Sequence, residues 1–178
     1  MSARADPLSD TQKDPGPEPT RPSPADAGDG TEAWRMAGLW AGAQGAAAVA
    51  LFFLAIDLGT GRPMWTPSAL GARLFQGQAL DPSVGWVPVL ALGYTLVHGA
   101  VFLAIGSIAS QVVANMKPGR TPSTMVVAAV LFLAIEATFV GFALLLHPDL
   151  FAQMGAGPVA LANMVAAIVM AMSLQRGS

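Results

Sequence analysis

The sequence predicts an all-α membrane protein, an antiparallel bundle of four transmembrane helices with a short interfacial helix in the first outer loop. Apolar residues make up 53% of the 178 residues and charged residues only 11%, whereas an ordinary soluble domain is about 25% charged. Seven of the eleven acidic residues also lie within residues 1–32. A soluble fold would therefore leave the surface of the remaining chain without charge and would aggregate, a difficulty that a lipid bilayer removes.

The first 32 residues differ in composition from the rest of the chain. They are rich in Pro, Asp, Gly and Ser, and Leu8 is almost their only large apolar residue. Such a segment cannot bury enough apolar surface to offset the entropy of ordering it. We expect a disordered, acidic, Pro-rich tail over residues 1–32, without a signal peptide, followed by a four-helix transmembrane domain over residues 33–178.

Four charge-poor apolar stretches follow the tail. Crossing the hydrocarbon region takes about 20 helical residues, and each stretch must be helical because a span in lipid has to satisfy its own backbone hydrogen bonds. Within all four stretches the only charged residue is Glu136. The predicted spans are residues 36–56, 86–114, 124–146 and 157–174.

The positions of Lys and Arg predict the orientation of the spans. Loops on the cytoplasmic side carry an excess of these residues. One side holds four cations near the span ends and the other side holds two, so we expect an inner (cytoplasmic) membrane protein with both termini in the cytoplasm. The two sets are Arg35, Lys117, Arg120 and Arg176 against Arg62 and Arg73.

The first outer loop contains the pattern of a short helix. Thr66 followed by Pro67 reads as an N-cap and a proline at the first helical position, and Gly77 is typical of a helix end. We therefore predict a helix over residues 67–76 that lies on the outer surface of the membrane.

The residues of this short helix divide into two faces. Leu70, Leu74 and Phe75 share one face by their spacing, while Arg73 points elsewhere. Trp65 precedes the helix and fits an anchor at the lipid–water interface.

Two ionisable side chains lie at mid-bilayer depth. His98 and Glu136 are each the thirteenth residue of their span, which places both about 18 Å from the end at which counting begins. Ionisable groups at this depth are costly and require partners. Because the second and third spans are antiparallel and joined by a short turn, we expect them to be neighbours and predict that His98 and Glu136 meet.

Three further polar residues are expected near this pair. Tyr94 lies one turn from His98 on the same face of the helix, Asn163 enters from the fourth span, and His147 ends the third. Together they predict a polar file in the outer half of the bundle.

The predicted pair has two interpretations. In the first, His98 and Glu136 form a structural hydrogen bond between two helices, worth about 0.6 kcal/mol. In the second, they exchange a proton and serve a proton-coupled channel or transporter. We favour the structural interpretation, because one polar contact is a small feature for a transporter.

Metal, haem and nucleic acid are poorly supported as partners. His98 and Glu136 supply two ligands where a zinc or copper site needs three or four, and the chain has no cysteine. His98 and His147 lie at different depths, so only a haem shared between two copies of the chain, as in an oligomeric haem- or quinone-binding protein, stays open. The net charge of −2 and the absence of a basic cluster indicate no nucleic-acid partner.

Small residues form rows on the first two spans. Gly38, Gly42 and Ala46 recur every four residues on the first span, and Gly99 and Gly106 are seven residues apart on the second. Such rows allow helix backbones to approach closely in lipid. They predict either a tight bundle or docking onto another membrane subunit.

Two short motifs carry a resemblance. The outer-loop run Thr66-Pro67-Ser68-Ala69-Leu70-Gly71 and the run Gly93-Tyr94-Thr95-Leu96-Val97-His98 resemble a family of small four-helix integral membrane proteins of bacteria. The resemblance implies a four-helix topology and no activity.

Catalytic motifs are lacking, including phosphate-binding loops, nucleophile elbows and paired-histidine helices. We therefore expect a non-enzymatic accessory or assembly subunit of a larger membrane complex, or a protein that self-associates. The alternatives are the proton-coupled transporter and, less favoured, the haem or quinone protein.

Overall fold

Every regular element that the structure describes is a helix. The computed structural model describes residues 24–116, 122–146 and 155–176. The predicted all-α class is confirmed. The elements are α1 (Pro24–Gly59), α2 (Trp65–Gln76), α3 (Pro88–Ala114), α4 (Thr124–Leu146) and α6 (Ala156–Arg176).

The four long helices match the predicted spans. Segments long and apolar enough to cross a membrane are Glu32–Gly59, Pro88–Ala114, Thr124–Leu144 and Ala156–Arg176. Large apolar side chains cover their outward faces; Met125, for example, is 81% exposed. In water such faces would associate, so the chain is a multi-pass membrane protein.

The predicted tail and the first helix overlap. Residues 1–23 lie outside the described residues, but α1 already begins at Pro24, before the expected tail boundary at residue 32. Proline suits the first turn of a helix, because the N–H that it lacks has no partner there. The described part of α1 therefore includes the last residues of the segment expected to be the tail.

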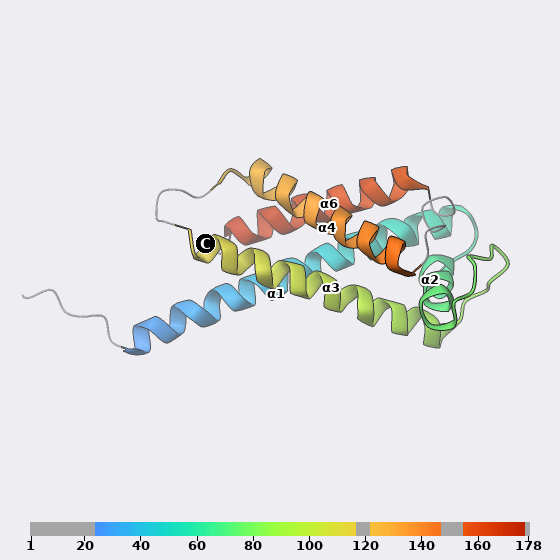
Figure 1. The fold of residues 1–178 in the computed structure, drawn as a ribbon, viewed down its shortest axis with the longest axis horizontal. Coiled ribbons are helices and arrows are strands. Elements are labelled where there is room, and N and C mark those ends of the chain that lie inside the picture. Colours follow the sequence, from blue (N-terminus) through green and yellow to red (C-terminus); the bar gives the residue numbers. More distant parts are fainter. Residues whose placement is uncertain (1–23, 117–121, 147–154, 177–178) are drawn as a thin grey trace, which may run out of the picture.

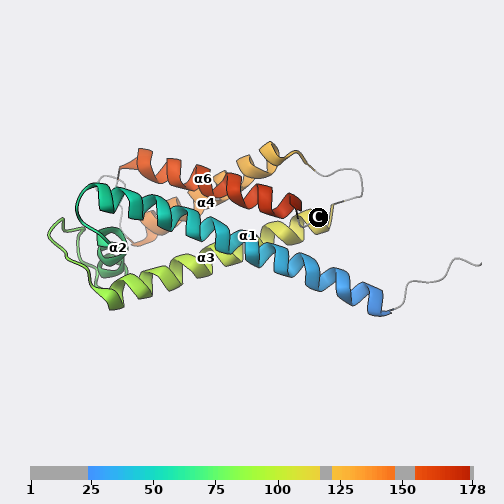
Figure 2. The ribbon, with the colours of Figure 1, turned by 180° about the vertical axis from the view of Figure 1, so that it is seen from behind.

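The helices run alternately up and down, and both ends of the described chain lie at the end of the bundle away from α2 (Figure 1). Helix α1 packs against α3 on one side and α6 on the other, and α4 packs against α6 (Figure 2). Helices α3 and α4 barely touch. The prediction that the second and third spans are neighbours is therefore wrong.

Glycines explain why α3 pairs with α1. A Cβ added at Gly106 would lie 2.3 Å from the Gly38 carbonyl oxygen, and one at Gly42 would lie 2.5 Å from the Phe102 oxygen. Both are impossibly short contacts, so the two backbones touch where these glycines meet, as small residues allow in lipid. Gly99 has no such neighbour within 4 Å and takes no part in this crossing.

The core is built mainly from α1, α4 and α6, to which α3 adds the buried Phe102 and the partly buried Ile105 and Ala109. Leu131 and Ile135 of α4 pack with Ala166 and Met170 of α6, all nearly or fully buried. The small face of α6 lets α1 and α4 approach it from two sides.

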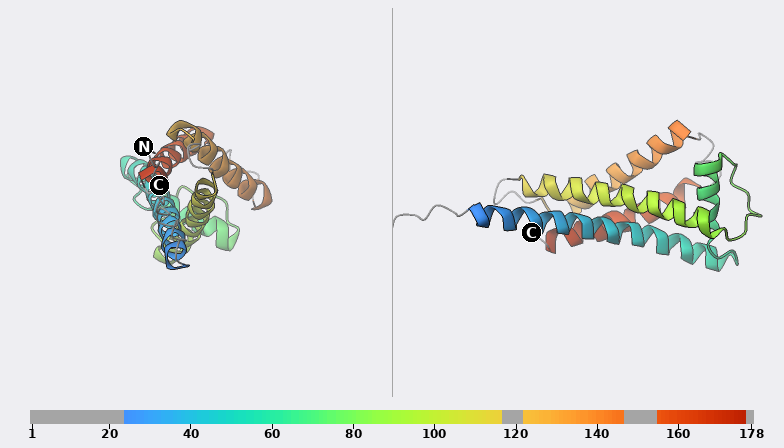
Figure 3. Two further views of the ribbon diagram at one scale, coloured as in Figure 1. Left: turned by 90° about the vertical axis from the view of Figure 1, so that its left-hand side faces the viewer. Right: turned by 90° about the horizontal axis from the view of Figure 1, so that it is seen from below.

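Helix α2 lies across the end of the bundle opposite the termini (Figures 1 and 3). It begins at Trp65, two residues earlier than predicted, and Gly77 ends it in the left-handed conformation as expected. Thr66 is not its N-cap. The cap position is Met64, and Asp57 of α1 instead accepts hydrogen bonds from Thr66 N at 2.8 Å and Thr66 Oγ1 at 2.6 Å.

Small residues attach α2 to the bundle. Its buried residues are Thr66, Ser68, Ala69, Gly71 and Ala72. The face by which α2 packs on the bundle is therefore not the apolar face of Leu70, Leu74 and Phe75, because the close approach of α2 to α3 at Gly71 selects small side chains. Leu70 and Leu74 are half-buried, and Phe75 is exposed.

The outer loop after α2 is held by side chains. Trp65 Nε1 donates to the Asp81 carbonyl oxygen at 2.9 Å, and the Arg62 guanidinium lies over the Trp65 ring. The Asp81 carboxylate accepts from Ser83 Oγ at 2.7 Å and from Ser83 N at 2.8 Å. These bonds lower the pKa of Asp81.

Candidate functional site

The site begins with three rings on one face of α3. Tyr94, His98 and Phe102 are spaced four residues apart, so they stand one above another on the helix. The Tyr94 and His98 rings stack with centroids 5.7 Å apart, and the His98 and Phe102 centroids are 4.8 Å apart. The expectation that Tyr94 and His98 share a face is confirmed.

The partner of His98 is a backbone group of α1. Its Nε2 lies 3.3 Å from the Ala46 carbonyl oxygen. The glycine crossing causes this contact, since it brings the α1 backbone within reach of the imidazole. The predicted pairing of His98 with Glu136 is wrong among the described residues, because α3 and α4 are separated.

Glu136 instead contacts α6. Its Oε1 accepts a hydrogen bond of 3.0 Å from Asn163 Nδ2. Asn163 is 5% exposed, so a buried polar group is matched with a hydrogen-bond partner, as burial demands. Asn163, which was expected only to lie near the His98–Glu136 pair, is therefore the hydrogen-bond partner of Glu136.

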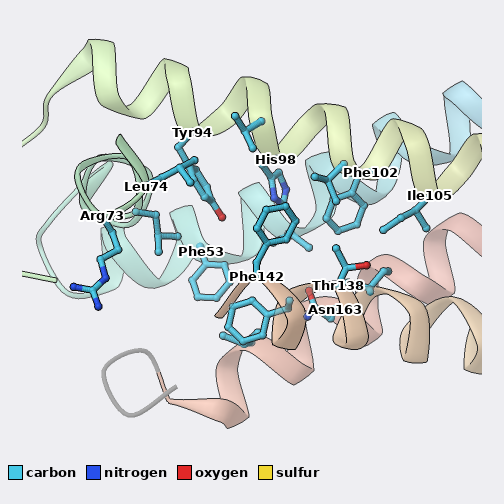
Figure 4. A pocket seen from close by; sticks show the side chains of 17 residues that line it. Phe53, Arg73, Leu74, Tyr94, His98, Phe102, Ile105, Thr138, Phe142 and Asn163 are labelled. Carbon is cyan, nitrogen blue, oxygen red and sulfur yellow. The ribbon is translucent and has the colours of Figure 1, made fainter. Parts of the chain in front are cut away.

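A cavity of about 180 Å³ lies between α3 and α4 (Figure 4). Side chains from all five described helices line it, and most of them are apolar or aromatic. The lining residues are Val49, Phe53, Leu70, Arg73, Leu74, Tyr94, Val97, His98, Val101, Phe102, Ile105, Ile135, Thr138, Phe139, Phe142, Val159 and Asn163.

Three of the five predicted polar residues line this cavity. Tyr94 and His98 reach it from α3, and Asn163 reaches it from α6 on the opposite wall (Figure 4). Thr138 of α4 adds a hydroxyl, which donates to the Ala134 carbonyl oxygen at 2.7 Å. A largely apolar hollow with a few convergent polar groups is the usual form of a small-molecule site.

Arg73 lies at the α2 end of the cavity. The helical pattern placed it away from the apolar face, but it is half-buried and lines the cavity. Its Nη1 donates to the Gln78 carbonyl oxygen at 3.1 Å, while its buried Nε has no hydrogen-bond partner among the described residues. The Arg73 side chain thus carries an unpaired N–H donor at the α2 end of the cavity wall.

The other predicted site residues have structural positions. Trp65 and Thr66 fix the loop and the start of α2 through Asp81 and Asp57, and Pro67 lies in the first turn of α2. None of the three lines the cavity. His147 lies outside the described residues.

Sequence reasoning missed Thr138 and the phenylalanines of α4. Ile135, Phe139 and Phe142 recur at the spacing of one helical face, and this pattern is the feature that marks the wall.

Across residues 24–116, 122–146 and 155–176, no group of three or more His, Asp or Glu side chains gathers in the manner of a metal site.

Comparison of the chain with protein families, with curated proteins and with solved structures finds no match. The resemblance of the outer-loop motifs to small bacterial membrane proteins stays a prediction.

Proposed function

We propose that this membrane protein binds a lipid-soluble small molecule in the cavity between α3 and α4. The observation that carries the proposal is a hollow of about 180 Å³ with mostly apolar walls, which the polar residues Tyr94, His98, Thr138 and Asn163 line from the membrane-spanning helices. A cavity of about 150 Å³ in a protein core is enough to bind benzene. The size supports a ligand with a single ring.

The packing of the helices supports access from lipid. Helices α3 and α4 both line the cavity but barely contact each other. Val97 on α3 and Phe142 on α4 line it and are also 37% and 45% exposed. A molecule dissolved in the bilayer can therefore pass between them without crossing water.

This proposal replaces the roles considered from the sequence for His98 and Glu136. A proton relay needs the two groups in contact, and each has a different partner. A porphyrin is much larger than a cavity of single-ring size, so haem is not the ligand we propose. We assign the polar groups of the cavity to binding rather than to catalysis. Each is held in a fixed orientation by a hydrogen bond or a stacked ring, as recognition of a ligand requires.

The test is to fill the cavity. Val101→Trp places an indole in the hollow, while Leu96→Trp adds the same group on the outward face of α3, where Leu96 is 65% exposed. Protein purified in lipid nanodiscs is extracted and its bound lipophilic compounds are measured by mass spectrometry. We expect a single-ring compound in the wild type and in Leu96→Trp but not in Val101→Trp. Equal amounts in both variants would contradict the proposal.

A second candidate function is that of a subunit docked onto another membrane protein. The favouring observation is that α4 packs extensively only against α6 and barely touches α3, so much of its surface is not covered by another described helix. The glycine row gives no such support, because α1 and α3 use it for each other. Native mass spectrometry after mild extraction is the measurement: a stoichiometric partner supports docking, and a monomer that retains its ring compound supports the first proposal alone.

We also propose the inner membrane as the location, with both termini in the cytoplasm. Arg35 and Arg176 lie at the end of the bundle away from α2, whereas Arg62 and Arg73 lie near α2. The chain has no cysteine, so single cysteines report on each side cleanly. An impermeant maleimide should label Ser83→Cys in intact spheroplasts and leave Ser123→Cys unlabelled until the membrane is opened.

A further inference from the structure

We infer that the cavity selects a ring that carries a hydroxyl group, as in a phenol or quinol, over a ring that presents only carbonyl oxygens, as in a quinone. This inference rests on the proposed function and names the chemistry of the ligand. It follows from the hydrogen bonds within the protein, which already use the protons of several polar groups that line the cavity.

His98 offers the ligand a lone pair. The Ala46 carbonyl oxygen can only accept a hydrogen bond, so the contact of 3.3 Å places the imidazole proton on Nε2. In the neutral ring the other nitrogen, Nδ1, is then an acceptor. Tyr94 and Phe102 pack against the two sides of the ring, which holds it in this orientation.

Thr138 also offers only lone pairs. A hydroxyl carries one proton, and Thr138 Oγ1 donates it to the Ala134 carbonyl oxygen of its own helix at 2.7 Å. Because Thr138 lines the cavity, what it presents to a ligand is an acceptor.

Asn163 extends this set of acceptors. Its Nδ2 donates to Glu136 Oε1 at 3.0 Å, and its amide oxygen forms no hydrogen bond with any described residue. Glu136 thus acts as a positioning residue, since it holds the amide so that the nitrogen is occupied and the oxygen stays unpaired.

The donors lie toward the α2 end of the cavity. Tyr94 is one turn nearer to α2 than His98, and Arg73 belongs to α2 itself. One carbonyl oxygen of a quinone can accept a hydrogen bond from these donors. Its second carbonyl oxygen, at the other end of the ring, would lie among His98, Thr138 and Asn163, which present only acceptor atoms. A quinol donates there and accepts near Tyr94. A buried acceptor that faces another acceptor loses its hydrogen bond to water and gains none in return. The hydroxyl form should therefore bind more tightly than the carbonyl form.

The size of the cavity narrows the class further. About 180 Å³ takes one ring and excludes the fused rings of a sterol. The phenyl groups of Phe53, Phe139 and Phe142 line the hollow and suit a flat aromatic ring. A tail on that ring leaves through the gap between α3 and α4.

The test compares three probes with the same tail: a decyl-substituted benzoquinone, its hydroquinone kept reduced under argon, and a decylphenol. Each is titrated by calorimetry into the wild-type protein in nanodiscs. We expect the hydroquinone and the phenol to bind at least about tenfold more tightly than the quinone, the factor for one lost hydrogen bond. If the hydroquinone binds and the phenol does not, two hydroxyls are required and the ligand is a quinol.

Variants assign the preference to the acceptors. His98→Phe keeps a ring and removes Nδ1, and Thr138→Val keeps the shape and removes Oγ1; either should reduce the preference severalfold. Thr95→Val is the matched control, because Thr95 makes the same bond to its own helix at 2.7 Å but lies outside the cavity lining. Thr138→Val answers the question even if His98→Phe does not fold.

The outcomes separate the two proposals. Binding of the quinone as tight as that of the hydroquinone, or a preference unchanged in both variants, overturns the inference and leaves the proposed function standing. No binding of any of the three probes overturns the proposed function and the inference with it.

Discussion

At the scale of single residues, Asp57 ties α2 to the end of α1. It is 2% exposed, and its carboxylate accepts hydrogen bonds from both the backbone and the side chain of Thr66. Asp57→Ala leaves two donors unmatched, a loss of about 2 kcal/mol, which is a fall of roughly 4–8 °C in Tm for a chain of this length. Thermal unfolding in detergent, followed by circular dichroism, measures it.

The control for this prediction is Asp81→Ala. Asp81 also accepts two hydrogen bonds, but only within an exposed turn, so the same substitution should change Tm by much less. Equal effects of the two substitutions would mean that Asp57 does not hold α2 in place.

A second prediction concerns the pH dependence of that turn. The Ser83 hydroxyl and backbone N–H lower the pKa of Asp81. The stabilisation of the turn by the ionised carboxylate is therefore fully present above the ordinary pKa of an aspartate, and it is lost as the pH falls through the lowered pKa. Ser83→Ala removes the larger cause, and the pKa should rise toward the ordinary value. A carboxyl-carbon NMR titration measures it; an unchanged pKa would assign the shift to the backbone N–H.

Residue-scale reasoning from sequence predicted the shared face of Tyr94 and His98 but not the partners of His98 and Glu136. The spacing of Tyr94 and His98 along one helix predicts their stacking, which depends only on helix geometry. The partner of His98 depends on which helix lies opposite, and residues 36–46 decide that through their glycines. The position of Arg73 at the cavity was not predicted either, because α2 packs on the bundle by its small residues rather than by its leucines.

At the scale of elements, the crossing of α1 and α3 is the contact that determines the bundle. Gly106→Val would place side-chain atoms within the Gly38 backbone, where even a Cβ is 2.3 Å from the oxygen. Overpacking of this kind costs about 1–3 kcal/mol, and the backbones must separate. We expect a lower Tm and a weakened His98–Ala46 contact.

Gly99→Val is the matched control for this prediction. Gly99 lies on the same helix seven residues earlier, and a Cβ there meets nothing within 4 Å. Its Tm should stay within about 2 °C of the wild type or rise, since valine replaces a residue that disfavours helix. A similar loss of stability in both variants would show that the close approach of the α1 and α3 backbones does not account for the effect of Gly106→Val.

The elements themselves were well predicted because lipid imposes simple requirements. A run of about 20 apolar residues without charge has one stable conformation in a bilayer, and all four spans are found where the sequence places them. The start of α2 was harder to predict, because the carboxylate that accepts from the backbone N–H of Thr66 belongs to Asp57, a residue of another helix.

At the scale of the whole molecule, the cavity results from the order in which the helices pack. Because α1 lies between α3 and α6, and α6 between α1 and α4, the bundle closes only weakly between α3 and α4. No local pattern in the sequence states this order. It depends on the sum of the glycine contacts on α1 and the alanine face of α6, which compete with the short connection between α3 and α4.

The last prediction concerns the gap between α3 and α4 as the route to the cavity. The absence of cysteine allows a clean pair, Val97→Cys with Phe142→Cys, at two positions that line the cavity and are partly exposed. A flexible bismaleimide across the pair should slow the exchange of a bound ring compound by at least about tenfold without lowering Tm, because it restrains opening but removes no core contact. Exchange is measured by dilution of a deuterated probe. The reference is the double-cysteine variant without the reagent, and each single-cysteine variant should exchange equally fast with and without it, since one attachment leaves the helices free to part. Exchange that stays fast in the bridged protein would mean that the ligand uses another route.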